Sequence, residues 1–263
     1  MSNHKALNML GRSGNPSLNA QTFADSAKDA NFSNYAPTAT MTLEGTVNKT
    51  GILLALVVIS AFYTWSEFFS TGNPASVMAL AMGGAIVGFI LALVTIFKKQ
   101  WSGTTAPLYA IAEGLFLGAI SAIFEAQYPG IVIQAVGLTL GTLASLLFLY
   151  KTGIVKPTEN FRLMVTSATM GIAMLYLVSM LMNMFGSGGI GFIHSNGLFG
   201  IGFSLFVVAI AALNLVLDFD FIEQGSEMGA PKYMEWFGAF SLMVTLIWLY
   251  LEMLRLLAKL RSR

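Results

Sequence analysis

Apolar residues in this chain are gathered into seven long stretches, and polar residues are concentrated between them and in the first 48 residues. Each stretch is close to the ~20 residues that an α-helix needs to cross the hydrocarbon core of a membrane. The breaks contain turn-forming pairs such as Asn73-Pro74 and Pro129-Gly130. The pattern predicts an all-α integral membrane bundle of seven transmembrane helices, at about 51–69, 75–97, 107–124, 131–150, 163–184, 198–218 and 235–257.

The segment before the first apolar stretch has a different composition. Residues 1–48 are rich in Asn, Ser, Ala and Thr, with scattered charges. Such a segment cannot bury enough apolar surface to offset the entropy lost on ordering. We therefore expect a disordered cytoplasmic N-terminal tail over 1–48 and a seven-helix transmembrane domain over 49–263. The tail has no apolar signal-peptide core, so the first span is expected to direct insertion.

The composition supports a membrane protein and excludes several kinds of site. Hydrophobic residues make up 56% of the chain and charged residues only 10%, whereas soluble domains carry about 25% charged residues. There is no cysteine, which excludes disulfides, thiolate metal sites and a cysteine nucleophile. The chain has two histidines, His4 and His194, and no basic stretch interleaved with aromatic residues. We therefore expect no cofactor and no nucleic-acid partner.

The positions of Lys and Arg predict the topology, because these residues concentrate in cytoplasmic loops. They occur in the tail and in the loops after the second and fourth spans, at Lys98, Lys99, Lys151, Lys156 and Arg162. The N-terminus is therefore expected in the cytoplasm. After seven spans the C-terminus should lie outside, although it is basic. Either the last stretch crosses with a basic outer end, which we favour, or it re-enters and both termini are cytoplasmic.

Ionisable residues in the apolar stretches are candidate functional groups, because each is costly in hydrocarbon. Asp218 and Asp220 end the sixth stretch, and their spacing puts them about 200° apart around a helix. Asp218 is in line with Asn214, one turn back in the span. Asp220 is in line with Glu223, which leads toward water. We therefore expect Asp218 to belong to the bundle and Asp220 to the exit.

Glu113 lies about two turns from the cytoplasmic end of the third stretch. The topology places it at a depth similar to that of Asp218. Two carboxylates in a dry site can share a proton or bind a cation, which is the chemistry of a pH-sensitive cation gate or a proton relay. The alternative is that a neutral Glu113 only hydrogen-bonds a neighbouring helix.

The last stretch has a polar stripe at helical spacing, made of Ser241, Thr245, Trp248, Glu252, Arg255 and Lys259. Glu252 and Arg255 can pair along the helix (i, i+3), which reduces the cost of both. Glu235 begins this helix, where its charge suits the positive end of the helix dipole. We interpret Glu235 as a helix cap.

Glycine pairs at four-residue spacing recur in the apolar stretches, as Gly84/Gly88, Gly114/Gly118 and Gly137/Gly141. Apolar burial does not drive helix association in lipid, and such pairs let two helix backbones approach closely. They support a compact bundle and indicate nothing more specific.

An enzyme is not expected. Gly202-Phe203-Ser204 is similar to part of a serine-protease nucleophile elbow, but no histidine base lies in a span. Two intramembrane aspartates can form an aspartyl protease, yet Asp218 and Asp220 face apart and no second span carries Asp in this way.

Several of these segments together resemble a known family. Seven spans, LDFDFIE at the end of the sixth and a final helix ending in LRLL are similar to the Bax inhibitor (transmembrane Bax-inhibitor motif) family. The segments TLEGTVNKTG, AEGLFLGAIS and MEWFGAF…WLYLEMLRLL are similar to its bacterial branch, and the resemblance covers about residues 40–260. It implies a fold in which six helices wrap the last one in two layers, in the bacterial inner membrane.

The resemblance also implies a function. Members behave as pH-sensitive calcium leak channels gated by a pair of aspartates on the last two helices. Some bacterial relatives instead bind and modulate a membrane-embedded AAA protease. The alternative for this chain is therefore a non-conducting protein that binds and modulates a membrane protease or other membrane proteins.

Only one of the family's two gating aspartates has a matching aspartate in this sequence. Asp218 matches the family's aspartate at the end of the sixth span, and Asp220 stands where relatives usually have an amide. The second aspartate falls on Thr245, which cannot ionise. We expect Glu113 to substitute for it, with Glu252 as the weaker substitute, and Asp218 with Glu113 to bind calcium transiently. The candidate ion-gate and pH-sensing residues are Asp218, Glu113, Asn214, Asp220, Thr245 and Glu252.

Overall fold

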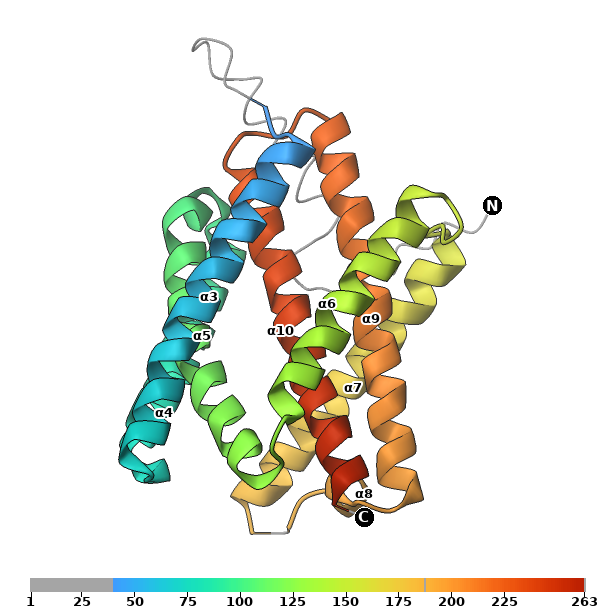
Figure 1. Cartoon of the computed structure of the whole chain (residues 1–263). Coiled ribbons are helices and arrows are strands. Elements are labelled where there is room, and N and C mark those ends of the chain that lie inside the picture. Colours follow the sequence, from blue (N-terminus) through green and yellow to red (C-terminus); the bar gives the residue numbers. More distant parts are fainter. Residues whose placement is uncertain (1–39, 187, 263) are drawn as a thin grey trace. The chain divides into compact units, whose positions relative to one another are not determined.

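A computed structural model describes residues 40–186 and 188–262, and residues 1–39 of the predicted tail lie outside them. The described part is helical, and its β-structure is one isolated bridge, between Thr40 and Pro231. Seven of its helices are long and apolar enough to cross a membrane, so the predicted all-α architecture with seven spans is confirmed. The elements, shown in Figure 1, are α3 (Leu43–Thr71), α4 (Pro74–Phe97), the 3-10 turn η1 (Lys99–Trp101), α5 (Ser102–Gln127), α6 (Ile131–Lys151), α7 (Glu159–Met184), α8 (Gly191–His194), α9 (Leu198–Glu227) and α10 (Met234–Arg261).

The first helix begins earlier than the sequence predicted. Thr42 has an extended backbone, and its side-chain oxygen accepts a hydrogen bond from the Gly45 amide, so that it caps α3. Residues 43–48, which were predicted to be part of the tail, are therefore helical. The next helix begins in the same way, with Asn73 as the cap and Pro74 at the first helical position.

The chain divides into two compact units, which are described separately. Of the described residues, the α3–α5 unit holds 40–129 and 221–244, that is α3, α4, α5, the end of α9 and the first part of α10. The α6–α9 unit holds 130–220 and 245–262, that is α6, α7, α8, most of α9 and the rest of α10.

Close helix packing in the α3–α5 unit depends on glycines. Both α3 and α4 pack against α5 (Figure 1). A Cβ added to Gly84 of α4 would lie 2.5 Å from the carbonyl oxygen of Ala112 in α5, and one added to Gly114 of α5 would lie 2.5 Å from that of Val57 in α3. These glycines therefore let α5 approach α3 and α4 closely.

The third glycine pair behaves differently. Gly137 and Gly141 of α6 have no atom of the described chain within 4 Å of an added Cβ. Glycine spacing along one helix does not say whether another helix faces it. These two glycines leave room on α6.

α10 is the most enclosed of the seven spans. In its most apolar 18-residue window 78% of the residues are buried, against 56% for α9 and 50% for the span that includes α5. α10 is also a single helix of 28 residues, whereas a re-entrant segment has to reverse direction inside the membrane. The structure therefore favours the full crossing over re-entry.

Large apolar side chains remain exposed on the less enclosed helices. Phe62 of α3, Phe89 of α4 and Phe148 of α6 are 68%, 64% and 65% exposed. Soluble proteins rarely leave so many large apolar groups in water. These surfaces suit contact with lipid chains.

Candidate ion-gate site

Asp218 lies on α9 in the α6–α9 unit and is fully buried. Its Oδ2 accepts a hydrogen bond from the Thr245 hydroxyl of α10 at 2.5 Å. Hydrogen bonds between a hydroxyl and an ionised carboxylate are short, about 2.5–2.7 Å, and stronger than neutral ones. The bond therefore joins α9 to α10 at a buried position. The sequence paired these two residues through the family resemblance, and the structure brings them together.

Asn214 lies one turn from Asp218 on α9 and is also buried. Its Nδ2 donates to the Thr169 hydroxyl of α7 at 2.8 Å and to the Ile210 carbonyl at 2.9 Å. Its Oδ1 is buried and has no hydrogen-bond partner in the described chain, and the same holds for Oγ1 of Thr166 on α7. A buried unsatisfied acceptor costs about 1–3 kcal/mol, so fold stability alone does not account for these polar groups.

Asp220 does not lead toward water, and this part of the prediction was wrong. The residue is 8% exposed, and its Oδ2 accepts a hydrogen bond at 2.5 Å from Arg162 in the first turn of α7. The periodicity of α9 alone could not reveal this partner from another helix. The pair places the start of α7 and the end of α9 at the same end of the unit, as the predicted topology requires.

Glu252 of α10 forms the predicted pair with Arg255. Its Oε1 accepts hydrogen bonds from Arg255 Nη1 at 2.6 Å and from the Tyr176 hydroxyl of α7 at 3.0 Å. Arg255 Nη1 also donates to the Tyr176 hydroxyl at 3.0 Å. Glu252 Oε2 is buried and has no hydrogen-bond partner among the described residues. Tyr176 could not be predicted from the sequence, because its contacts are between helices and nothing in its own apolar stretch marks it.

Glu113 lies on α5, in the α3–α5 unit. Its side chain is half-buried against Gly88 of α4, where an added Cβ would lie 2.8 Å from Oε1. The structure thus brings Asp218, Asn214 and Thr245 together in one unit and places Glu113 in the other. The role of Glu113 as the substitute acid stays a prediction. So does transient calcium binding, since the described residues contain no group of three or more His, Asp or Glu that could hold a metal ion.

Comparison with known proteins identifies the family. The sequence model of the proteins described as Bax inhibitor 1 like matches residues 15–262. The chain belongs to the Bax inhibitor 1-like family. No curated protein and no solved structure matches it. Family membership and the seven apolar helices together make it a multi-pass membrane protein.

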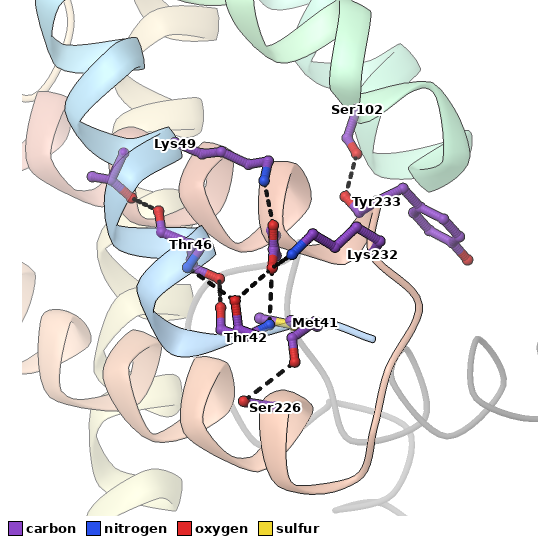
Figure 2. Close-up of polar contacts among 11 residues, drawn as sticks. Met41, Thr42, Thr46, Lys49, Ser102, Ser226, Lys232 and Tyr233 are labelled. Carbon is purple, nitrogen blue, oxygen red and sulfur yellow. Dashed lines mark hydrogen bonds and ion pairs between the residues drawn. The ribbon is translucent and has the colours of Figure 1, made fainter. Parts of the chain in front are cut away.

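This Bax inhibitor 1-like chain has a further buried carboxylate, Glu235 at the start of α10. Its Oε1 accepts hydrogen bonds from the Thr42 amide at 2.9 Å, the Thr42 hydroxyl at 2.8 Å and Lys232 Nζ at 2.7 Å. Its Oε2 is paired with Lys49. Figure 2 shows the side chains of Lys49, Lys232 and Thr42 meeting in this network. The carboxylate therefore ties the start of α3 to the start of α10, beyond the helix-cap role that the sequence indicated.

We expect Glu235→Gln to lower the free energy of unfolding by about 2 kcal/mol, because two ammonium groups lose their shared counter-charge and hydrogen bonds to a charged group are worth about 1.5–3 kcal/mol. The measurement is unfolding of the purified protein in detergent micelles by increasing sodium dodecyl sulfate. The control is Glu44→Gln, because Glu44 is an exposed acid in the first turn of α3. Equal losses for the two variants would show that the network contributes nothing specific.

Proposed function

We propose that this Bax inhibitor 1-like protein is a pH-sensitive cation leak channel that passes calcium and is gated at Asp218. The observation that carries the proposal is the fully buried Asp218 carboxylate, which accepts a hydrogen bond from Thr245 of a second helix. An ionisable group inside a membrane span is costly, and it commonly marks an ion pathway. Asn214, one turn away, adds an unpaired oxygen, and oxygen atoms are the ligands that calcium prefers.

In this proposal, the hydrogen bond between Thr245 and Asp218 holds the channel in its closed state. A cation that reaches Asp218 competes with the Thr245 hydroxyl for the same carboxylate oxygen. Protonation of Asp218 removes the charge that attracts the cation and also weakens the hydrogen bond. Cation flux is therefore expected to depend on pH through Asp218, with Glu113 as the predicted second acid.

The proposed orientation has a cytoplasmic N-terminus, and the proposed location is a bacterial inner membrane. Lys and Arg in the loops after the second and fourth spans support this orientation. The contact between Arg162 and Asp220 puts the start of α7 and the end of α9 on one side of the membrane, and the loop charges assign that side to the cytoplasm. We propose no enzymatic activity for the chain.

The test is calcium entry into dye-loaded liposomes that contain the purified protein, measured from mildly acidic to mildly alkaline pH. We expect the parent to conduct with a defined pH midpoint and Asp218→Asn to lose the pH dependence, because the amide cannot ionise. A shifted pH midpoint in Glu113→Gln would support the substitute acid. Loss of the pH dependence in Asp218→Asn together with an unchanged midpoint in Glu113→Gln would keep the channel and remove Glu113 from the gate.

The competing role is that of a non-conducting partner of a membrane protease or of other membrane proteins. Folded parent protein without calcium flux at any pH would favour it over the channel. Co-purification of membrane proteins with the full chain and with a variant lacking residues 1–45 would then show whether the N-terminal segment is needed for binding.

A further inference from the structure

Lys259, near the C-terminal end of α10, is 5% exposed. Its ammonium group donates to the carbonyl oxygen of Ile193 at 2.6 Å, the carbonyl oxygen of Gly200 at 3.0 Å and the hydroxyl of Ser204 at 2.8 Å. An ammonium has three N–H donors, so these three oxygens satisfy all of them. We call the three oxygen atoms the Lys259 cage. It consists of two carbonyl oxygens and one hydroxyl oxygen, none of them charged. In the selectivity filters of ion channels, rings of neutral carbonyl oxygens replace the water shell of a permeating cation.

The cage lies on the same stripe of α9 as Asp218. From Gly200 the positions 204, 207, 211, 214 and 218 follow at alternating steps of four and three residues, which is one face of a helix. At a rise of 1.5 Å per residue, Gly200 and Asp218 are about 27 Å apart along α9. The hydrocarbon core of a bilayer is about 30 Å thick. The stripe therefore runs nearly the full depth of a membrane, with Asp218 near one end and the Lys259 cage at the other.

α10 presents a matching set of polar residues to this unit. Thr245, Glu252 and Lys259 follow one another at steps of seven residues, so they share a face of the helix. Thr245 bonds Asp218 and Lys259 bonds Gly200 and Ser204. The two helices therefore run antiparallel along one polar seam, which we define by Gly200, Ser204, Asn214 and Asp218 of α9 and Thr245, Glu252 and Lys259 of α10.

Between its two ends, the polar seam contains acceptors that the fold leaves unused. Asn214 Oδ1 and Glu252 Oε2 are buried and have no hydrogen-bond partner in the described residues. Both atoms are oxygens, and both lie between the two ends of the seam by their positions on α9 and α10. Unsatisfied buried oxygens are costly, and a passing cation would be a partner for them.

We propose that Lys259 is a tethered cation that fills a cation site and closes the end of the polar seam opposite Asp218. We call this role of Lys259 the plug. This inference rests on the proposed function, because it assigns a second closure to the same cation path. The ammonium occupies the cage oxygens that an incoming cation would need, and its fixed charge repels a second cation at that end. A structural anchor that only fastens the segment from Ile193 to Ser204 to α10 would make the same three bonds, but it would not control flux.

The first experiment compares Lys259→Met with Arg261→Met in liposomes, with potassium and calcium entry as the readouts. Lys259→Met keeps the apolar stem and removes the ammonium, whereas Arg261 lies two residues away on the same helix end and is exposed. We expect cation flux to rise on the order of tenfold in Lys259→Met, since a nearby charge in a medium of low dielectric changes a barrier by this much. Arg261→Met should conduct like the parent. Unchanged flux in folded Lys259→Met, with a conducting parent, overturns the plug and leaves the proposed gate at Asp218 intact.

Other outcomes separate the two proposals. A parent without flux and a conducting Lys259→Met would support the plug. Absence of flux in the parent, in Asp218→Asn and in Lys259→Met, all folded, would overturn both proposals. If Lys259→Met does not fold, Ser204→Ala serves instead, because it keeps the lysine and removes one of the three cage oxygens. A rise in its flux supports the plug, and unchanged flux counts against it.

Chemical rescue tests the cage itself. Lys259→Ala lacks three carbons and the ammonium of the side chain, which together correspond to n-propylammonium. We expect n-propylammonium chloride to return the flux of Lys259→Ala toward the parent value and to raise its midpoint of thermal unfolding. Tetramethylammonium, which has no N–H donor, should do neither. No effect of n-propylammonium on flux or stability, in folded Lys259→Ala, would overturn the assignment of the cage as a cation site.

Discussion

Gly118→Ala in α5 is expected to lower the free energy of unfolding by about 3 kcal/mol, at the upper end of the usual cost of overpacking. A Cβ at this position would lie 2.1 Å from the carbonyl oxygen of Ala61 and 2.1 Å from the hydroxyl of Thr64, both in α3. The carbonyl is part of the α3 backbone, so it cannot rotate away as a flexible side chain would. The two helices would have to separate locally. The hydrogen bond of 3.1 Å from Thr64 to the Leu115 carbonyl of α5 would weaken with them.

The measurement is unfolding in detergent micelles, followed by loss of helical circular dichroism. Gly141→Ala in α6 is the matched control, because it makes the same change in a spanning helix where no atom of the described chain lies within 4 Å of the added Cβ. Alanine is a better helix former than glycine by about 1 kcal/mol, so Gly141→Ala should be neutral or slightly stabilising. Equal stability of the two variants would mean that close contact between α3 and α5 does not hold the unit together.

Only some features of the fold were predictable from the sequence. The lengths of the apolar stretches predict the spans, because the thickness of the hydrocarbon core sets a minimum length for each. The start of α3 at Leu43 depends instead on one capping residue, Thr42, whose neighbours have the composition of a disordered segment. Glycine spacing does not distinguish Gly114, where an added Cβ would meet α3, from Gly141, where it would meet no neighbouring helix within 4 Å.

The candidate site was predictable where the signal lies within one helix. A carboxylate in an apolar run identified Asp218, and spacing identified Asn214 and the pair of Glu252 with Arg255. Partners contributed by other helices were not visible, which is why Asp220 was wrongly assigned to the exit. Contacts of that kind require the tertiary packing, which periodicity does not contain.

The same limit applies to the two lysine contacts. Lys259 was recognised as part of a polar stripe, but its three oxygen partners come from two other helices, α8 and α9. Lys49 follows the capped start of α3, and its partner Glu235 lies 186 residues further along the chain. A charged side chain in a span costs free energy. The structure identifies the oxygen atoms that offset this cost for each lysine.

Thr245→Asp is expected to make cation flux steeply dependent on pH, with a change on the order of tenfold across the titration of the new pair. The Thr245 hydroxyl lies 2.5 Å from Asp218 Oδ2, so the variant places two carboxyl groups within hydrogen-bond reach at a buried position. Such a pair does not ionise twice at low cost, and it holds one proton between its members. Below the pH at which this proton is lost, the shared proton joins α9 to α10. Above that pH, two like charges repel each other, so cation flux should rise with increasing pH.

Two matched variants separate this effect from a simple loss of the Thr245 hydrogen bond. Thr245→Val has a similar shape without a donor, so it should raise flux at every pH without adding a titration. Thr245→Asp combined with Asp218→Asn leaves one carboxyl group, and the steep pH dependence should disappear. The nearby charges on Asp220 and Arg162 neutralise each other as a pair and are the same in all these variants. If the flux of Thr245→Asp has the same pH profile as that of Thr245→Val, the contact between positions 218 and 245 is not the gate. Two like charges at this contact would then have no effect on conduction.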